Sequence, residues 1–135
     1  MAYTTQTVLQ VITSAYRQLT MLDEINPPTP EQTQVALEVL NDMMMNFEMD
    51  GIHFGWYPQT SAAAIAPLQD TDVRNVKVML AKELATHWGI EIQPTLGERI
   101  KEAEEQNSKR SVRYVETDLT GLPFSQGGLF GPGRV

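Results

Sequence analysis

The sequence predicts an all-α fold: a four-helix bundle-like body at residues 1–115, with a long irregular loop between its second and third helices. An extended C-terminal arm follows at residues 116–135. Three observations lead to this prediction. Four segments repeat apolar residues at the three-to-four-residue spacing of a helix. Capping patterns open two of these segments. Five of the nine glycines lie in the last segment, which marks it as different in kind from the body.

The first helix is predicted over residues 5–22. Leu9 and Tyr16 are expected to widen its apolar face. The helix should end before Asn26-Pro27-Pro28, because proline lacks a backbone N–H and biases the residue before it away from the helical region. Its central stripe consists of Val8, Ile12, Ala15 and Leu19.

The second helix has the clearest start. Residues 29–32 read Thr-Pro-Glu-Gln, which is a capping box with proline at the first helical position. Met45 should point away from the core, and Gly51 is a natural residue to follow the helix end. The residues expected to face the core are Ala36, Leu37, Leu40, Met43, Met44 and Phe47.

Residues 52–69 are the least regular part of the body, and a short strand around residues 56–60 is predicted there. This segment carries three aromatic side chains, Phe54, Trp56 and Tyr57. Two interpretations are equally open. The aromatic residues cap the helix bundle, or they form a candidate surface for a tail partner, since Trp and Tyr are enriched at interfaces.

The third helix is expected to begin near Asp70 or Thr71 and to end at Gly89. The fourth is expected to open with a second capping box, Thr95 to Glu98. The apolar stripe of the third helix is Val73, Val76, Leu80, Leu84 and Trp88, and that of the fourth is Leu96, Ile100 and Ala103.

The predicted arm combines glycine and proline with separated apolar residues. A purely solvated tail would not carry such residues. We therefore expect the arm to bury them on a partner, as extended peptide segments do. The candidate anchors are Leu119, Leu122, Phe124, Leu129, Phe130 and Val135.

The composition excludes several classes of function. The chain has no cysteine, which removes disulfides, cysteine-ligated zinc and thiol nucleophiles. Its formal net charge is −7, so binding to nucleic-acid phosphates is not expected. The first residues resemble no signal peptide, and no apolar run approaches the length of a membrane span. No membrane association is predicted.

Catalysis has little support in the sequence. The two histidines, His53 and His87, lie in no zinc-binding pattern, so neither a metal nor a cofactor is expected. The neighbouring carboxylates Glu48 and Asp50 are best explained as a solvated helix face, as are Glu102, Glu104 and Glu105. The tail glycines neither follow a strand nor open a helix, as a phosphate-binding loop requires. The prediction is that the protein is not an enzyme.

Two stretches of the body resemble a known family. The first is Ala36-Leu37-Glu38-Val39-Leu40-Asn41-Asp42-Met43-Met44, followed by Asp50-Gly51. The second is Met79-Leu80-Ala81-Lys82-Glu83-Leu84-Ala85, followed by Trp88-Gly89-Ile90 and Pro94-Thr95-Leu96. In order and spacing they resemble the P22-type tail accessory factors, the head-to-tail adaptors or DNA-packaging stabilisation proteins of tailed phages. The resemblance covers residues 5–113. The link between the second and third helices is shorter here, and the arm has no motif that can be aligned.

The resemblance implies a structural virion protein at the head–tail junction, made in the cytoplasm of the host bacterium. Members of the family form a ring, a dodecamer, beneath the portal protein and dock on it through C-terminal arms. The implied partners are the portal, further copies of the chain, and the tail, nozzle or next connector protein. DNA would pass through the channel without specific binding. Two alternatives remain open: a tail-completion or stopper connector, and a cell-wall hydrolase.

Overall fold

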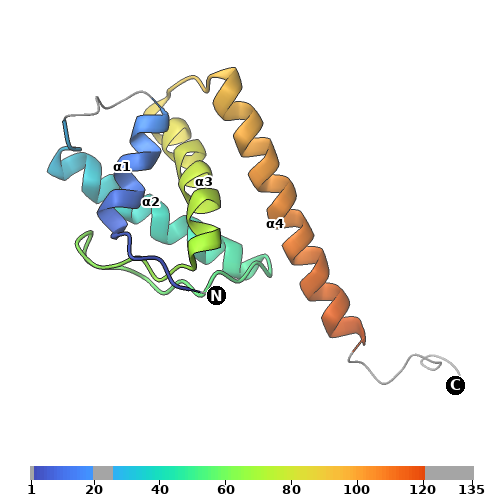
Figure 1. The fold of residues 1–135 in the computed structure, drawn as a ribbon. Helices are drawn as coiled ribbons and strands as arrows, with labels where there is room; N and C mark the ends of the chain where they lie inside the picture. The colour runs from blue at the N-terminus through green and yellow to red at the C-terminus, as the bar shows by residue number, and fades with distance from the viewer. Residues whose placement is uncertain (1, 20–25, 121–135) are drawn as a thin grey trace, which may run out of the picture.

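The computed structural model describes residues 2–19 and 26–120, with side chains as far as Lys109. Within these ranges it contains four helices and no named strand, which confirms the predicted all-α fold (Figure 1). The irregular linker between the second and third helices lies where it is predicted. The helices are α1 Val8–Gln18, α2 Pro30–Met49, α3 Asp70–Trp88 and α4 Pro94–Thr120.

α1 begins at Val8, three residues later than predicted, because Thr7 rather than Thr5 is positioned to cap it. The backbone N–H of Gln10 donates to the Thr7 hydroxyl oxygen at 3.2 Å. In return, the Thr7 N–H donates to the Gln10 side-chain oxygen at 2.8 Å. These two bonds complete a capping box, which satisfies backbone donors that have no partner inside the helix.

The buried face of α1 confirms the predicted stripe, with Val8, Ile12, Ala15, Tyr16 and Leu19 all buried. Leu9 is 38% exposed, so its predicted place on this face is wrong. The buried face continues through Val11 instead. The helix ends at Gln18, with Leu19 as its C-cap, and the predicted end at Leu22 lies outside the described residues.

The predicted start of α2 is confirmed in detail. Thr29 is the N-cap and Pro30 the first helical residue. The Gln32 N–H donates to the Thr29 hydroxyl at 3.1 Å, and the Thr29 N–H donates to the Gln32 side chain at 2.9 Å. The predicted ends of α2 and α3 are also confirmed: Gly51 follows the C-cap of α2 with φ 84°, and Gly89 caps α3 with φ 68°.

Replacing Thr29 by alanine is expected to lower the free energy of unfolding by about 1 kcal/mol, because the N-cap acceptor of α2 is lost. Urea denaturation followed by circular dichroism measures this difference. The matched control is Thr95→Ala, at an exposed threonine inside the first turn of α4, which should change stability by less than about 0.5 kcal/mol. Equal effects of the two substitutions would contradict the capping role.

α4 differs from the prediction at both ends. It begins at Pro94, so the predicted capping box from Thr95 to Glu98 is wrong: proline takes the first helical position and Thr95 lies inside the helix. At the other end, the helix continues to Thr120. Residues 116–120, predicted as the start of an extended arm, are therefore helical.

The strand predicted at residues 56–60 is absent from the described linker. Backbone pairing occurs further along, where residues 62–70 run antiparallel to residues 2–9. The Thr4 N–H donates to the Leu68 oxygen at 2.8 Å, and isolated bridges join Tyr3 to Gln69 and Thr7 to Ile65. Backbone N–H and C=O groups of the linker therefore find their hydrogen-bond partners in the N-terminal residues. The sequence of the linker alone does not predict this pairing, because the partners are distant in sequence.

The core lies between α1, α2 and α3, and one side chain links all three. Tyr16 of α1 is completely buried. Its hydroxyl donates to the backbone carbonyl oxygen of Gln32 in α2 at 2.8 Å. The same hydroxyl accepts a hydrogen bond from the indole N–H of Trp88 in α3 at 3.2 Å. Burial raises the pKa of the Tyr16 hydroxyl, an effect that the bond from Trp88 partly offsets.

α4 packs against α3 through its predicted apolar residues, Leu96, Ile100 and Ala103, which are all buried. It does not complete a closed bundle. In Figure 1 the helix lies beside the other three, and its C-terminal part extends past them.

Candidate partner-binding groove

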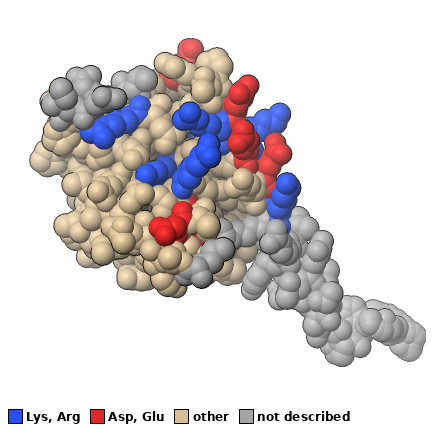
Figure 2. Space-filling model, viewed as in Figure 1, with Lys and Arg blue, Asp and Glu red and all other residues tan. Residues whose placement is uncertain are grey.

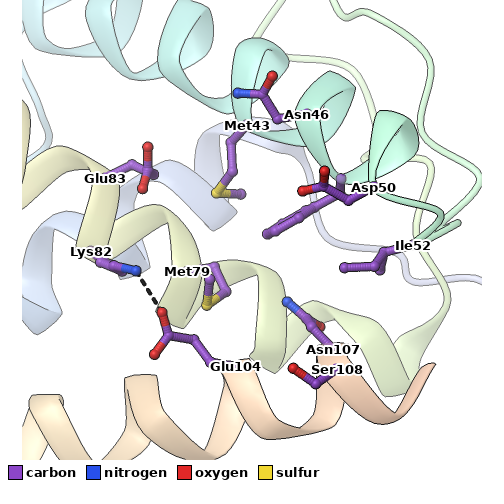
Figure 3. A pocket seen from close by; sticks show the side chains of 11 residues that line it. Met43, Asn46, Asp50, Ile52, Met79, Lys82, Glu83, Glu104, Asn107 and Ser108 are labelled. Atoms are coloured by element: carbon purple, nitrogen blue, oxygen red, sulfur yellow. Dashed lines mark hydrogen bonds and ion pairs between the residues drawn. The ribbon is translucent and has the colours of Figure 1, made fainter. Parts of the chain in front are cut away.

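An open groove of about 540 Å³ lies where the end of α2, the middle of α3 and the middle of α4 meet (Figure 3). Its floor is apolar and comes from three parts of the chain: α2, α3 and the start of the linker. Met43, Ile52 and Met79 are 5%, 8% and 6% exposed, and the half-buried Phe47 completes the floor.

The end of α2 shapes one wall of the groove. Gly51 adopts a left-handed conformation that side chains disfavour, and it reverses the chain after the helix. The Ile52 N–H then donates to the Phe47 oxygen at 2.8 Å, which places Ile52 against the floor. The Phe47 ring in turn packs on Phe54, with ring centroids 5.6 Å apart.

Acidic residues dominate the rim of the groove. Asp50, Glu83 and Glu104 lie around it, and Lys82 is the one cation among its lining residues. The Lys82 ammonium nitrogen lies 2.6 Å from a Glu104 carboxylate oxygen, so this pair neutralises itself. Asp50 and Glu83 add two further carboxylates to the rim. Among the described lining residues, carboxylates therefore outnumber cations.

Asn107 is the unusual residue of the groove. It is 5% exposed, and its Nδ2 has no hydrogen-bond partner among the described atoms. Figure 3 shows its side chain pointing into the groove, close to Met79 and Ile52. A buried donor without an acceptor costs about 1–3 kcal/mol, so an acceptor brought into the groove would be favourable. In the sequence, Asn107 follows Ile100 and Ala103 at helical spacing, so a polar residue on this otherwise apolar stripe is the signal that marks the site.

The three aromatic residues predicted to contact a tail partner differ in how deeply they are buried. Phe54 is 5% exposed and belongs to the core, so its assignment to a partner surface is wrong. Trp56 is half-buried, and its indole nitrogen donates to the Asn41 side chain at 3.1 Å. Tyr57 is 63% exposed and is the one member of the set that is free to meet a partner.

The predicted arm anchors lie mostly outside the described residues. The backbone of Leu119 belongs to α4 rather than to an extended segment. The remaining anchors, Leu122, Phe124, Leu129, Phe130 and Val135, fall beyond the described part of the chain. Their role in portal binding stays a prediction.

Charge is distributed unevenly over the molecule. Residues 1–73 contain one basic and nine acidic residues, whereas residues 74–135 contain nine basic and eight acidic residues. Figure 2 shows Lys and Arg side chains gathered on the face that includes α3 and α4. Arg74 of α3 and Arg99 of α4 line a common groove together with Glu102. Burial lowers the pKa of Lys77, which also lies on α3. The exposed surface of α2, in contrast, carries no basic residue.

The described residues hold no cluster of three or more His, Asp or Glu side chains arranged to bind a metal ion. Glu48 is exposed, and its carboxylate Oε1 lies 2.6 Å from the imidazole Nδ1 of His53. Across the described ranges, none of the helices has the length and apolar character needed to cross a membrane.

The residues that carry the family resemblance are mainly core residues. Leu40 and Met43 of α2 and Leu80 and Leu84 of α3 are buried in the core, and Gly89 ends α3. These motifs therefore specify how the body packs. No protein-family model matches the chain, and no curated protein matches it. The motifs and the geometry of the described residues are thus the basis for a functional proposal.

Proposed function

We propose that the protein is a structural component of a phage virion, a head-to-tail adaptor that forms a ring beneath the portal. In this role it docks on the portal through its C-terminal segment, helps to retain packaged DNA and provides the platform for the tail. It acts without catalysis and without a cofactor. Its place is the head–tail junction of the particle, after synthesis in the cytoplasm of the host bacterium.

The observation that carries this proposal is the division between a packed body and α4. The body buries the motif residues in one core, whereas α4 is 27 residues long and extends past the other helices in Figure 1. At about 1.5 Å per residue, such a helix spans roughly 40 Å. The end of this helix at Thr120 therefore lies away from the packed body (Figure 1).

The charge distribution supports assembly into a ring. Along α2, Glu38, Asp42, Met45 and Met49 are exposed at the spacing of one helical face. Arg74 and Arg99, on α3 and α4, form no ion pair among the described side chains. An acidic face of one copy can thus meet the basic face of the next, which is the head-to-tail contact that closes into rings. The portal would add the multivalent surface that holds the ring together.

A charge-swap experiment tests this assembly. The purified protein is mixed with the portal protein encoded beside it, and native mass spectrometry counts the copies bound. The variants Glu38→Lys/Asp42→Lys and Arg74→Glu/Arg99→Glu should each reduce occupancy of the portal at least about tenfold, because like charges then face each other. An equimolar mixture of the two variants should restore occupancy, because their reversed faces are complementary.

The matched control is Glu31→Lys with Lys101→Glu, two exposed charges outside the proposed contact. It should bind as the unchanged protein does. Absence of binding by the unchanged protein would contradict the adaptor function. Binding that the charge swaps leave unaltered would contradict the proposed contact between copies but not the docking itself.

A further inference from the structure

The N-terminal segment pairs with the linker on one side and presents an unpaired backbone edge on the other. Alternate residues bond to the linker, as in the 2.8 Å hydrogen bond from the Thr4 N–H to the Leu68 carbonyl oxygen. In an antiparallel pair, the backbone groups of the residues in between point to the opposite side. Those residues are Tyr3 and Thr5, whose N–H and C=O groups form no hydrogen bond within the described part of the chain.

This edge is open to solvent. Tyr3 is 70% exposed, and Thr5 is exposed as well. Backbone groups that are buried are nearly always paired, so unpaired groups on exposed residues mark an accessible edge. Figure 1 shows the N-terminus at the margin of the body, near the start of α3. The N–H and C=O groups of Tyr3 and Thr5 are therefore available to a second extended chain.

The segment lacks the features by which proteins usually protect an exposed strand. Lysine, proline and bulges at an edge normally prevent pairing between copies. Residues 2–9 contain no charged residue and no proline, and three of them are threonine, whose branched side chain favours paired strands. The first charged side chain of the sequence is that of Arg17. Two copies of this segment can therefore pair without placing like charges opposite each other.

We propose that the edge at Tyr3 and Thr5 is a self-association site, where two copies of the chain pair as antiparallel strands about a twofold axis at Thr4. In this register, Tyr3 of one copy lies opposite Thr5 of the other. Such a pair exchanges both of its N–H···O bonds, and the twofold axis repeats the pair. The exposed Tyr3 ring also gains a branched cross-strand neighbour, which is a favourable combination.

This pairing is distinct from the contact proposed between neighbouring copies in the ring. A twofold contact uses the same surface on both copies and closes with two subunits, whereas a head-to-tail contact continues around a ring. The pairing also uses neither the acidic face of α2 nor the arginines Arg74 and Arg99. It therefore belongs to the free protein, and it does not depend on the adaptor function.

Sedimentation velocity and amide hydrogen exchange test the pairing in the full-length protein, with its own N-terminus and without the portal. The protein concentration is raised from about 10 μM to about 1 mM, a range that covers weak association. We expect a dimer to form over this range. Nuclear magnetic resonance should show the Tyr3 and Thr5 amides exchanging at least about tenfold more slowly in the dimer, since hydrogen bonding protects them.

Two variants interrupt the edge. Thr5→Pro removes one of its donors, and Thr5→Lys adds a charge beside the twofold axis. Each should raise the dissociation constant of the dimer at least about tenfold. The matched control is Ile65→Lys, which places the same charge at an exposed residue of the linker strand, opposite Thr7 and away from the edge. It should leave the dimer unchanged, and circular dichroism verifies that every variant keeps its helical content.

Absence of a dimer at about 1 mM would overturn the proposal, and so would a dimer that Thr5→Lys leaves unaltered. Equal loss of the dimer in Ile65→Lys would also overturn it, because the exposed side chains rather than the backbone edge would then make the contact. Protection of amides other than those of Tyr3 and Thr5 would contradict the proposed register. Because the portal is absent, these outcomes are independent of whether the adaptor function is correct.

Discussion

Replacement of Asn41 by alanine is expected to lower the free energy of unfolding by about 2–4 kcal/mol, because several buried groups lose their partners together. The Asn41 side-chain Nδ2 donates to the backbone carbonyl oxygen of Gln59 at 2.9 Å. Its Oδ1 accepts from the Gln59 N–H at 2.9 Å and from the Trp56 indole nitrogen at 3.1 Å. Gln59 is 7% exposed, so water cannot readily replace these bonds.

The Asn41 prediction is checked by urea denaturation, with tryptophan fluorescence reporting the surroundings of Trp56. Asn46→Ala is the matched control on the same helix, since the Asn46 side chain is exposed. It should change the free energy of unfolding by less than about 0.5 kcal/mol. A loss below that value for Asn41→Ala as well would show that the side chain does not hold the linker. Asn41 belongs to the stretch that resembles the adaptor family, and its role here is structural.

Deletion of residues 121–135 is expected to reduce portal binding by at least about a hundredfold, because avidity multiplies the loss of each docking contact around a ring. The deletion begins after α4, which ends at Thr120. It therefore leaves the body and its core residues in place. Surface plasmon resonance on immobilised portal measures the change, and circular dichroism verifies that the helical content of the body is retained.

Two full-length variants locate the docking residues within the deleted segment. Leu122→Ser/Phe124→Ser and Leu129→Ser/Phe130→Ser each remove two of the predicted anchors. At least one of them should weaken portal binding by about tenfold or more, since buried aromatic anchors dominate such interfaces. Undiminished binding by the deletion variant would contradict docking through the C-terminal segment and would move the portal contact to the helical body.

The helical elements could largely be predicted because local chemistry determines them. Thr29 and Gln32 form their capping box within one turn, and Gly89 ends α3 where the chain needs a left-handed residue. The errors in the predicted starts of α1 and α4 also have local causes. Thr7 and Gln10 form a capping box that is visible in the sequence. Because this box caps α1 at Thr7, the helix begins at Val8 and not near Thr5. Pro94 begins α4 because the first helical position tolerates proline.

The groove and the linker could not be predicted in the same way, because both depend on residues distant in sequence. Residues 62–70 find their backbone partners at the N-terminus. The groove unites Met43, Met79 and Asn107 from three helices. Phe54 and Tyr57 are only three positions apart, yet one is buried and the other exposed. Aromatic content alone does not distinguish a core residue from a contact residue.

The most direct test of the adaptor proposal is electron cryo-microscopy of the phage particle whose genome encodes this chain. The proposal predicts a dodecamer ring between the portal and the tail, with the helical bodies side by side around the DNA channel. It further predicts density for residues 121–135 against the portal. A particle whose head–tail junction lacks this chain, or in which the chain lies elsewhere, would contradict the proposal.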